Sequence, residues 1–133
     1  MMTHKKDLYL MLIDNDRHVR ESLKVFFNAS QTNFLIFKSG EQGLNSLKYQ
    51  RMDVVISDYF LPDMDGVEFL KKAAQIQPEL TRILMATITS EDLEREILAE
   101  GIDRFIEKPL TVATLDTVIS ELAPLNFSNP SRR

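Results

Sequence analysis

The chain has 133 residues and carries 16 Lys and Arg against 20 Asp and Glu, for a formal net charge of −4. This length is typical of one domain with one hydrophobic core. The absence of cysteine excludes disulfide bonds, zinc–thiolate sites and thiol catalysis, and the acidic balance argues against a general nucleic-acid binder.

No apolar run approaches the roughly 18–20 residues that a membrane helix needs. The best candidate for a signal peptide is Leu8 to Ile13. It is too short, and acidic residues follow it where a cleavage site would need small ones. We therefore expect a cytoplasmic protein with no membrane partner.

In chain order, five short apolar runs are predicted to be strands, and the segments after them carry apolar residues at helical spacing. The runs are Leu8–Ile13, Phe34–Phe37, Val54–Ile56, Ile83–Ala86 and Ile102–Ile106. The last run is the weakest because Asp103 and Arg104 interrupt it.

Capping residues predict where the helices begin and end. The candidate N-caps are Asp16, Ser39, Asp65 and either Thr89 or Ser90. We expect the fourth helix to stop near Gly101, since glycine is favoured after a helix, and the last helix to end at Pro124.

Strand then helix, five times over, predicts the α/β class: an open, doubly wound parallel sheet with helices on both faces. A closed eightfold barrel would need about 250 residues and is excluded by length. We expect this domain to span residues 1–124, and residues 125–133 to form a flexible C-terminal tail or linker stub.

The carboxyl ends of parallel strands meet at one edge of such a sheet, and ligands bind there. The first, third, fourth and fifth runs are followed by Asp14-Asn15-Asp16, Asp58, Thr87 and Lys108, respectively. The second run ends in Lys38 and Ser39 and is predicted to be an edge strand away from the site.

Carboxylates gathered at one edge repel each other, and a hard divalent cation relieves that repulsion. Oxygen ligands select Mg²⁺ or Ca²⁺ over zinc, and Mg²⁺ typically keeps a phosphate oxygen among its ligands. Thr87 and Lys108 would then contact that phosphate, and an aspartate can itself accept the phosphoryl group.

These residues resemble the receiver domains of two-component response regulators, of the chemotaxis-regulator type, from Leu8 to about Leu122. The resemblance rests on four motifs in order: Ile13-Asp14-Asn15-Asp16, Ser57-Asp58 with Leu61-Pro62-Asp63-Met64-Asp65-Gly66, Thr87, and Lys108-Pro109. It implies a flavodoxin-like five-stranded sheet in the order 2-1-3-4-5.

The resemblance also implies roles at the acidic centre. Asp58 corresponds to the phosphoacceptor. Asp14, Asn15, Asp58 and the backbone carbonyl of Phe60 correspond to the Mg²⁺ ligands. The second acidic residue of the family is usually Asp, so Asn15 is a departure that predicts weaker Mg²⁺ binding.

Three further residues correspond to the switch. Thr87 matches the hydroxyl that moves toward the phosphoryl group, Lys108 matches the lysine that pairs with it, and Phe105 matches the aromatic that turns inward. Phe105 is equally well explained as a core residue. Ile88 replaces a residue that is usually small, and the Lys108–Pro109 bond is expected to be cis.

The implied function is a phosphoacceptor signalling domain rather than an enzyme, with slow self-dephosphorylation at most. A histidine kinase or phosphotransfer protein would be the donor. A downstream protein, a missing effector domain or a second copy would read the surface formed by the last two strand–helix units.

Two other functions remain open. Asp14-Asn15-Asp16 also resembles the D-x-D motif of haloacid-dehalogenase-type phosphatases, in which the first Asp is the nucleophile. Alternatively, Asn15 and Ile88 leave room for a receiver-like interaction domain that works without phosphorylation.

Overall fold

The computed structural model describes residues 8–30, 32–87 and 89–128, where five strands and five helices alternate. The strands are β1 (Tyr9–Ile13), β2 (Asn33–Phe37), β3 (Val54–Asp58), β4 (Thr81–Ala86) and β5 (Arg104–Glu107). The helices are α1 (Arg17–Ser30), α2 (Gly40–Leu47), α3 (Gly66–Ile76), α4 (Glu91–Glu100) and α5 (Val112–Ser128). None of these helices is long and apolar enough to cross a membrane.

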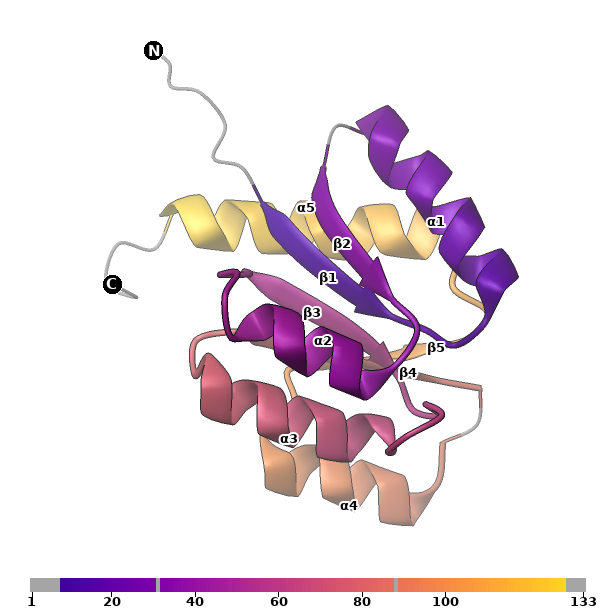
Figure 1. Cartoon of the computed structure of the whole chain (residues 1–133), viewed down its shortest axis with the longest axis vertical. Helices are drawn as coiled ribbons and strands as arrows, with labels where there is room; N and C mark the ends of the chain where they lie inside the picture. The colour runs from indigo at the N-terminus through magenta and orange to yellow at the C-terminus, as the bar shows by residue number, and fades with distance from the viewer. Residues whose placement is uncertain (1–7, 31, 88, 129–133) are drawn as a thin grey trace.

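The strands form one parallel sheet in the order β2-β1-β3-β4-β5 (Figure 1). The predicted fold class and strand order are therefore confirmed, and β2 lies at the edge as expected. Every strand runs in the same direction, so all five carboxyl ends lie along one edge of the sheet.

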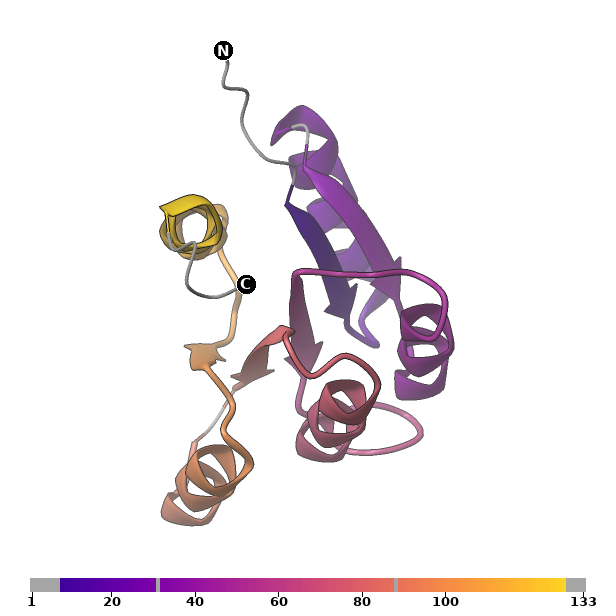
Figure 2. The same ribbon diagram turned by 90° about the vertical axis from the view of Figure 1, so that its left-hand side faces the viewer.

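Helices cover both faces of the sheet, with α1 and α5 on one side and α2, α3 and α4 on the other (Figure 2). Side chains of a strand alternate between the two faces. Leu10 and Leu12 of β1 pack in the α1/α5 layer, whereas Met11 and Ile13 pack in the layer of α2, α3 and α4. This double burial explains why the strands read as continuous apolar runs.

The predicted helix caps are confirmed. Capping depends on neighbouring residues alone, so a local pattern can predict it. Side chains of Asp16, Ser39, Asp65 and Ser90 accept backbone N–H groups of the first helical turn at 2.8–3.2 Å. Ser90 is therefore the cap, and not Thr89. Gly101 ends α4 with φ 72°, the left-handed conformation that glycine adopts most easily.

The prediction for the fifth strand was wrong at its start. Arg104 begins β5 instead of interrupting it, and its Cα pairs with that of Ile83. Asp103 lies just before β5 and contacts β4 twice at Arg82: its N–H donates to the Arg82 carbonyl at 2.9 Å, and its carboxylate accepts the Arg82 N–H at 2.8 Å. Ile102 is buried at the end of α4 rather than in the strand.

The prediction that Pro124 ends the last helix was also wrong, since α5 continues to Ser128. A proline removes only its own N–H from the ladder and crowds the carbonyl four residues earlier, so it can interrupt the bonding without ending the helix. Residues 129–133 of the predicted tail lie outside the described residues, and the boundary after residue 124 stays a prediction.

Candidate functional site

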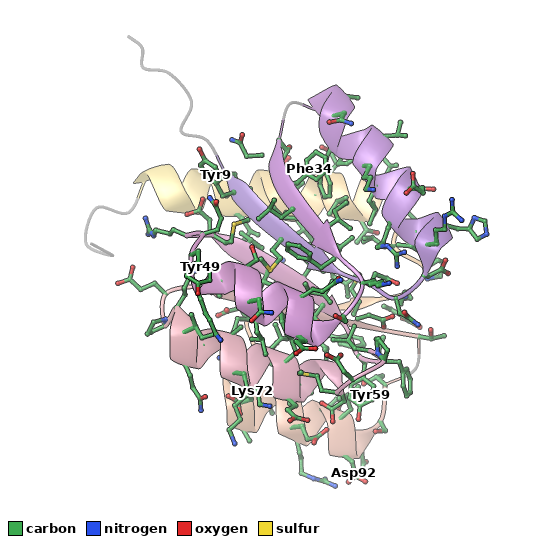
Figure 3. The ribbon with its side chains drawn as sticks, in the orientation of Figure 1. Tyr9, Phe34, Tyr49, Tyr59, Lys72 and Asp92 are labelled. Carbon is green, nitrogen blue, oxygen red and sulfur yellow. The ribbon has the colours of Figure 1, made fainter. Side chains whose placement is uncertain are left out.

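The parallel sheet brings the predicted site residues to one edge. Asp58 is the last residue of β3, Asp14 and Thr87 directly follow β1 and β4, and Lys108 directly follows β5. The register of β1 against β3 places Asp14 beside Asp58. Tyr59, the residue after Asp58, marks this end of the molecule in Figure 3, opposite Tyr49.

Lys108 joins the two carboxylates. Its ammonium nitrogen, Nζ, lies 3.2 Å from Oδ2 of Asp14 and 3.2 Å from Oδ2 of Asp58. These contacts connect residues that are 94 and 50 positions apart in the chain. Asp14 is fully buried and Asp58 is 8 % exposed, so both charges lie largely out of water.

Burial raises the pKa of Asp14, because a carboxylate loses hydration when it leaves water. The backbone N–H of Asp16, which donates to Oδ1 at 2.8 Å, and the Lys108 ammonium both act to lower this pKa. Burial prevails, so the charged form of Asp14 is less stable here than in the unfolded chain.

The pKa of Lys108 is raised, although burial alone would lower it. Burial acts to lower it, but the charges of Asp14 and Asp58 and their hydrogen bonds raise it above its usual value. The ammonium is therefore held in its charged form. One positive charge faces two carboxylates, so the cluster has spare negative charge for a cation.

Asp58 is also held by the loop that follows it. The backbone N–H of Phe60 donates to Oδ1 of Asp58 at 3.4 Å. The Phe60 ring is 73 % exposed and packs edge-on against Tyr59, with the ring centroids 4.9 Å apart. The second carboxylate oxygen of Asp58 faces Lys108, so its two oxygens have different neighbours.

Asn15 and Asp16 occupy different places beside the cluster. Asn15 directly follows buried Asp14 and is exposed at the edge of the sheet. Asp16 caps α1 by accepting the N–H of His18 at 2.8 Å, as predicted for a candidate N-cap. The Asp14 carbonyl accepts from the Arg20 guanidinium at 2.9 Å, which fastens the turn to α1.

Thr87 and Phe105 lie on the β4 and β5 side of the site. Thr87 is exposed, and its hydroxyl hydrogen-bonds to no side chain within the described ranges. Phe105 is half-buried and lines a cavity of about 330 Å³ together with Thr89, Glu94, Ile97 and Leu98. Ile88 lies outside the described residues, and the expected cis bond between Lys108 and Pro109 is confirmed.

The donor atoms at this edge suit a hard cation. In the part of the chain that the structure describes, no three His, Cys, Asp or Glu side chains gather as a metal-binding group. The oxygen donors that the structure brings together here are the carboxylates of Asp14 and Asp58, each 3.2 Å from the same Lys108 nitrogen. Mg²⁺ takes one or two protein carboxylates and completes its shell with other oxygens, so the residues fit it.

Two residues of the β3–α3 loop have roles that the sequence did not reveal. Asp63 accepts the backbone N–H groups of Gly40 and Glu41, at 3.0 and 2.8 Å, and so joins the loop to α2. Although desolvation acts to raise the pKa of Asp63, these hydrogen bonds hold it below its usual value. Gly66 begins α3 directly after its N-cap Asp65, and this Asp-Gly pair was the sequence signal for a tight turn there. The Gly66 N–H donates to the Tyr59 carbonyl at 2.6 Å.

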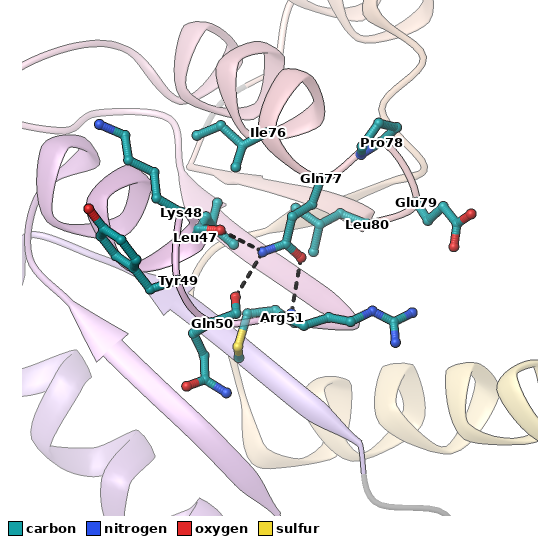
Figure 4. A pocket seen from close by; sticks show the side chains of 11 residues that line it. Leu47, Lys48, Tyr49, Gln50, Arg51, Ile76, Gln77, Pro78, Glu79 and Leu80 are labelled. Carbon is teal, nitrogen blue, oxygen red and sulfur yellow. Dashed lines mark hydrogen bonds between the residues drawn. The ribbon is translucent and has the colours of Figure 1, made fainter.

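A second cavity, of about 530 Å³, lies at the opposite edge of the sheet, between the ends of α2 and α3 (Figure 4). The Gln77 amide crosses it, donating to the carbonyls of Leu47 and Gln50 at 2.8 Å and accepting from the Met52 N–H at 3.1 Å. The Gln77 side chain, at the end of α3, thereby holds the segment that follows α2 in place. The cavity is lined by Lys48, Arg51 and Glu79 among others, whereas the Asp14–Asp58–Lys108 edge joins two carboxylates to one ammonium at 3.2 Å.

The fold and this edge together define an open α/β domain with two carboxylates and a lysine gathered at the carboxyl ends of its strands, and comparison with known families identifies the class. The model of the response regulator receiver domain matches residues 10–120. The chain therefore belongs to the response regulator receiver family of two-component systems.

Curated relatives are longer than this chain. The transcriptional regulatory protein AfsQ1 of Streptomyces coelicolor is 29% identical over 111 residues, which cover 83% of this chain and 48% of AfsQ1. The DNA-binding transcriptional regulator NtrC of Klebsiella pneumoniae is 29% identical over 113 residues, covering 82% of this chain and 24% of NtrC. The chain thus spans about half or less of the length of these two relatives.

A solved structure supports the fold at lower identity. The CheY-like receiver domain protein of Methanospirillum hungatei superposes with a TM-score of 0.84 at 24% identity, covering 90% of this chain and 96% of that one. At this identity the likeness concerns the fold alone, which is the chemotaxis-regulator type that the motifs predicted.

Proposed function

We propose that Asp58 accepts a phosphoryl group from a phosphorylated histidine of a kinase or phosphotransfer protein, with Mg²⁺ held beside it. The observation that carries this proposal is the placement of the Lys108 ammonium 3.2 Å from both the Asp14 and the Asp58 carboxylates. An aspartate that served only to stabilise a turn would need neither a half-buried lysine nor a second carboxylate beside it.

A known complex supports the class of partner. The receiver domain of Ssk1 has been solved together with the histidine phosphotransfer protein Ypd1 of Saccharomyces cerevisiae, and it superposes on this chain with a TM-score of 0.83 at 15% identity. It covers 93% of this chain and 94% of that one. We therefore propose that this chain also has a partner with a phosphorylated histidine. We carry over no specific contact from that complex.

The proposed transfer is a displacement at phosphorus. An Asp58 carboxylate oxygen forms the new P–O bond while the P–N bond to the donor histidine breaks, and the imidazole nitrogen keeps the bonding electron pair. The chain's own contribution is position and charge: Asp58 is fixed at the end of β3, and Lys108 offers a positive charge to the phosphoryl oxygens.

The cation would be held by the carboxylates of Asp14 and Asp58, the carbonyl of Phe60 and the side chain of Asn15. When bound, Mg²⁺ neutralises charge on the transferring group. Burial raises the pKa of Asp14 although the Lys108 ammonium acts to lower it, and a bound cation would offset the charge of this buried carboxylate further.

The signal would leave the site through β4 and β5. The new phosphoryl oxygens would draw Thr87 and Lys108 together, and Phe105 would move into the 330 Å³ cavity that it lines. This would change the surface of α4, β5 and α5, which a downstream protein, an effector domain or a second copy would recognise. We place this function in the cytoplasm, without direct binding of nucleic acid.

Intact mass after incubation with acetyl phosphate and Mg²⁺ tests the proposal. We expect one phosphoryl adduct on the wild-type chain and none on Asp58→Asn. Peptide mapping should place the label on Asp58. A label on Asp14 would instead support the D-x-D phosphatase, and substrate turnover would contradict the assignment as a non-enzymatic signalling domain.

One observation favours a second function, an interaction domain that works without phosphorylation. Asn15 brings no charge to the cation site, and Lys108 already pairs with both carboxylates. A titration with Mg²⁺ and beryllofluoride, a phosphoryl mimic, separates the two. Shifts of the Asp58 and Thr87 amide signals would support phosphorylation, and no response to either ligand would support the interaction domain.

A further inference from the structure

The loop between β3 and α3 is closed at its base by backbone hydrogen bonds. The Tyr59 N–H donates to the Met85 carbonyl at 2.8 Å, and the Gly66 N–H donates to the Tyr59 carbonyl at 2.6 Å. Phe60 and Asp65 form an antiparallel bridge just beyond. Phe60 is therefore hydrogen-bonded across the loop to the residues that begin α3, and Tyr59 is anchored to β4.

The tip of the loop is fastened to α2, which comes more than twenty residues earlier in the chain. Each carboxylate oxygen of Asp63 accepts one N–H of the first turn of α2: Oδ1 from Gly40 at 3.0 Å and Oδ2 from Glu41 at 2.8 Å. Such charge-assisted bonds at a helix N-terminus are stronger than neutral ones.

An apolar contact reinforces this joint. A Cβ atom at Gly40 would lie 2.8 Å from the sulfur atom of Met64, so the loop packs directly against the backbone of α2. Ser39 caps α2 independently by accepting the Gln42 N–H at 3.2 Å. Helix α2 thus has its own cap in Ser39. The two Asp63 bonds are additional to it, and they hold the loop against α2.

We infer that Asp63 is a positioning residue, which couples the Phe60 carbonyl at the cation site to the first turn of α2. The inference rests on the proposed function, because it assumes that the Phe60 carbonyl binds Mg²⁺. Coupling is reciprocal. Cation binding at Phe60 tightens the first turn of α2, and loosening that turn weakens cation binding.

A Mg²⁺ titration of the full chain, followed by the amide NMR signals, tests the coupling without any phosphorylation. In the wild type we expect the Gly40 and Glu41 signals to shift with the same midpoint as those of Asp58 and Phe60. In Asp63→Asn, an amide has one acceptor oxygen for two donors. The Mg²⁺ dissociation constant should rise about tenfold, as is typical when a group supporting a metal ligand is lost.

Two further variants separate positioning from charge. Glu41→Gln removes one negative charge next to the same joint without removing a hydrogen bond, and should change the dissociation constant by less than about twofold, as an exposed charge does. Gly40→Ala crowds Met64 without changing any charge and should weaken Mg²⁺ binding in the same direction as Asp63→Asn. It also provides a test if Asp63→Asn does not fold.

The outcomes distinguish this inference from the proposed function. If Mg²⁺ shifts the Asp58 and Phe60 signals but Asp63→Asn binds it no more weakly than Glu41→Gln does, the coupling is wrong and the proposed function stands. If Mg²⁺ shifts neither signal in the wild type, the cation site fails and the coupling fails with it.

Discussion

Single residues set the charge of the site, and Asn15 is an uncharged residue directly after the buried Asp14. Asp14 and Asp58 supply two carboxylates, and Lys108 cancels part of their charge. Asn15 is exposed next to them and contributes an amide where an acidic side chain is usual. Cation affinity depends on the number of charged ligands, so at the proposed Mg²⁺ site this one position would limit the affinity for the ion.

We expect Asn15→Asp to lower the Mg²⁺ dissociation constant by about tenfold, because it adds a charge beside a divalent ion. Isothermal titration calorimetry at fixed ionic strength measures the change. Asp16→Asn is the matched control, since Asp16 caps α1 and its charge lies one residue further along. Equal affinity in wild type and Asn15→Asp would show that position 15 does not face the cation.

Among the four glycines, Gly66 has the least space for a side chain. A Cβ atom there would lie 2.3 Å from the Asp58 carbonyl oxygen and 2.9 Å from the Cα atom of Tyr59. Both are backbone atoms, so no flexible side chain can give way.

Gly66→Ala should therefore lower the free energy of unfolding by about 1–3 kcal/mol, the usual cost of overpacking. Urea denaturation measures it. Gly43→Ala offers a comparison, because its Cβ would meet side-chain atoms of Ile13 and Phe69 instead. A Gly66→Ala chain as stable as the wild type would contradict the close approach of α3 to Asp58.

At the scale of elements, α4 is fastened mainly at its C-terminal end. The Arg82 guanidinium, from β4, donates to the carbonyls of Glu100 and Gly101 at 2.8 and 3.1 Å, and to that of Leu70 in α3 at 3.1 Å. Its charge also complements the negative end of the helix dipole. Nearer the start of α4, Leu93 is the one buried side chain of the helix.

Replacing Arg82 by methionine keeps the apolar stem but leaves three carbonyls without their donor. We expect a loss of about 3 kcal/mol in the free energy of unfolding, because buried polar groups lose their partners. Hydrogen exchange should speed up first at the C-terminal end of α4. Arg95→Met, an exposed arginine on the same helix, is the control and should be nearly neutral; equal effects would contradict the role of Arg82.

At the scale of the whole molecule, the burial of Asp14 costs stability at neutral pH. The folded-state pKa of Asp14 lies above its unfolded value, so the folded chain holds this proton more tightly. Stability from this group is present below the unfolded pKa of 3.8 and is lost as pH rises through the folded pKa. At neutral pH the charged carboxylate therefore works against folding.

Asp14→Asn should therefore raise the free energy of unfolding at pH 7 without Mg²⁺, by about 1.4 kcal/mol for each unit by which the Asp14 pKa is raised. The difference from wild type should shrink as pH falls toward 4, where the wild-type carboxyl becomes protonated. Urea denaturation between pH 4 and 7 measures both. A variant less stable than wild type at pH 7 would show that the Lys108 contact outweighs burial.

Much of this protein could be predicted from local pattern. Continuous apolar runs predicted strands buried on both faces, and residues such as Ser39, Asp65 and Gly101 marked helix ends, because capping and backbone conformation depend on near neighbours. Asp14, Asp58 and Lys108 follow predicted strands, so the same pattern predicted that they lie at one edge of the sheet. The errors lay at the start of the fifth strand and at Pro124: Arg104 pairs with Ile83 of β4, which no local pattern shows, and α5 continues past its proline.

The sequence by itself determined the alternation of strands and helices and the identity of the residues at the strand ends, since both follow from periodicity along the chain. Only the tertiary structure decided that one lysine contacts both carboxylates, that Asp63 holds α2, and that Arg82 fastens α4. These contacts join residues between 12 and 94 positions apart. Their distances and burial depend on how the strands and helices pack, and no local pattern encodes that packing.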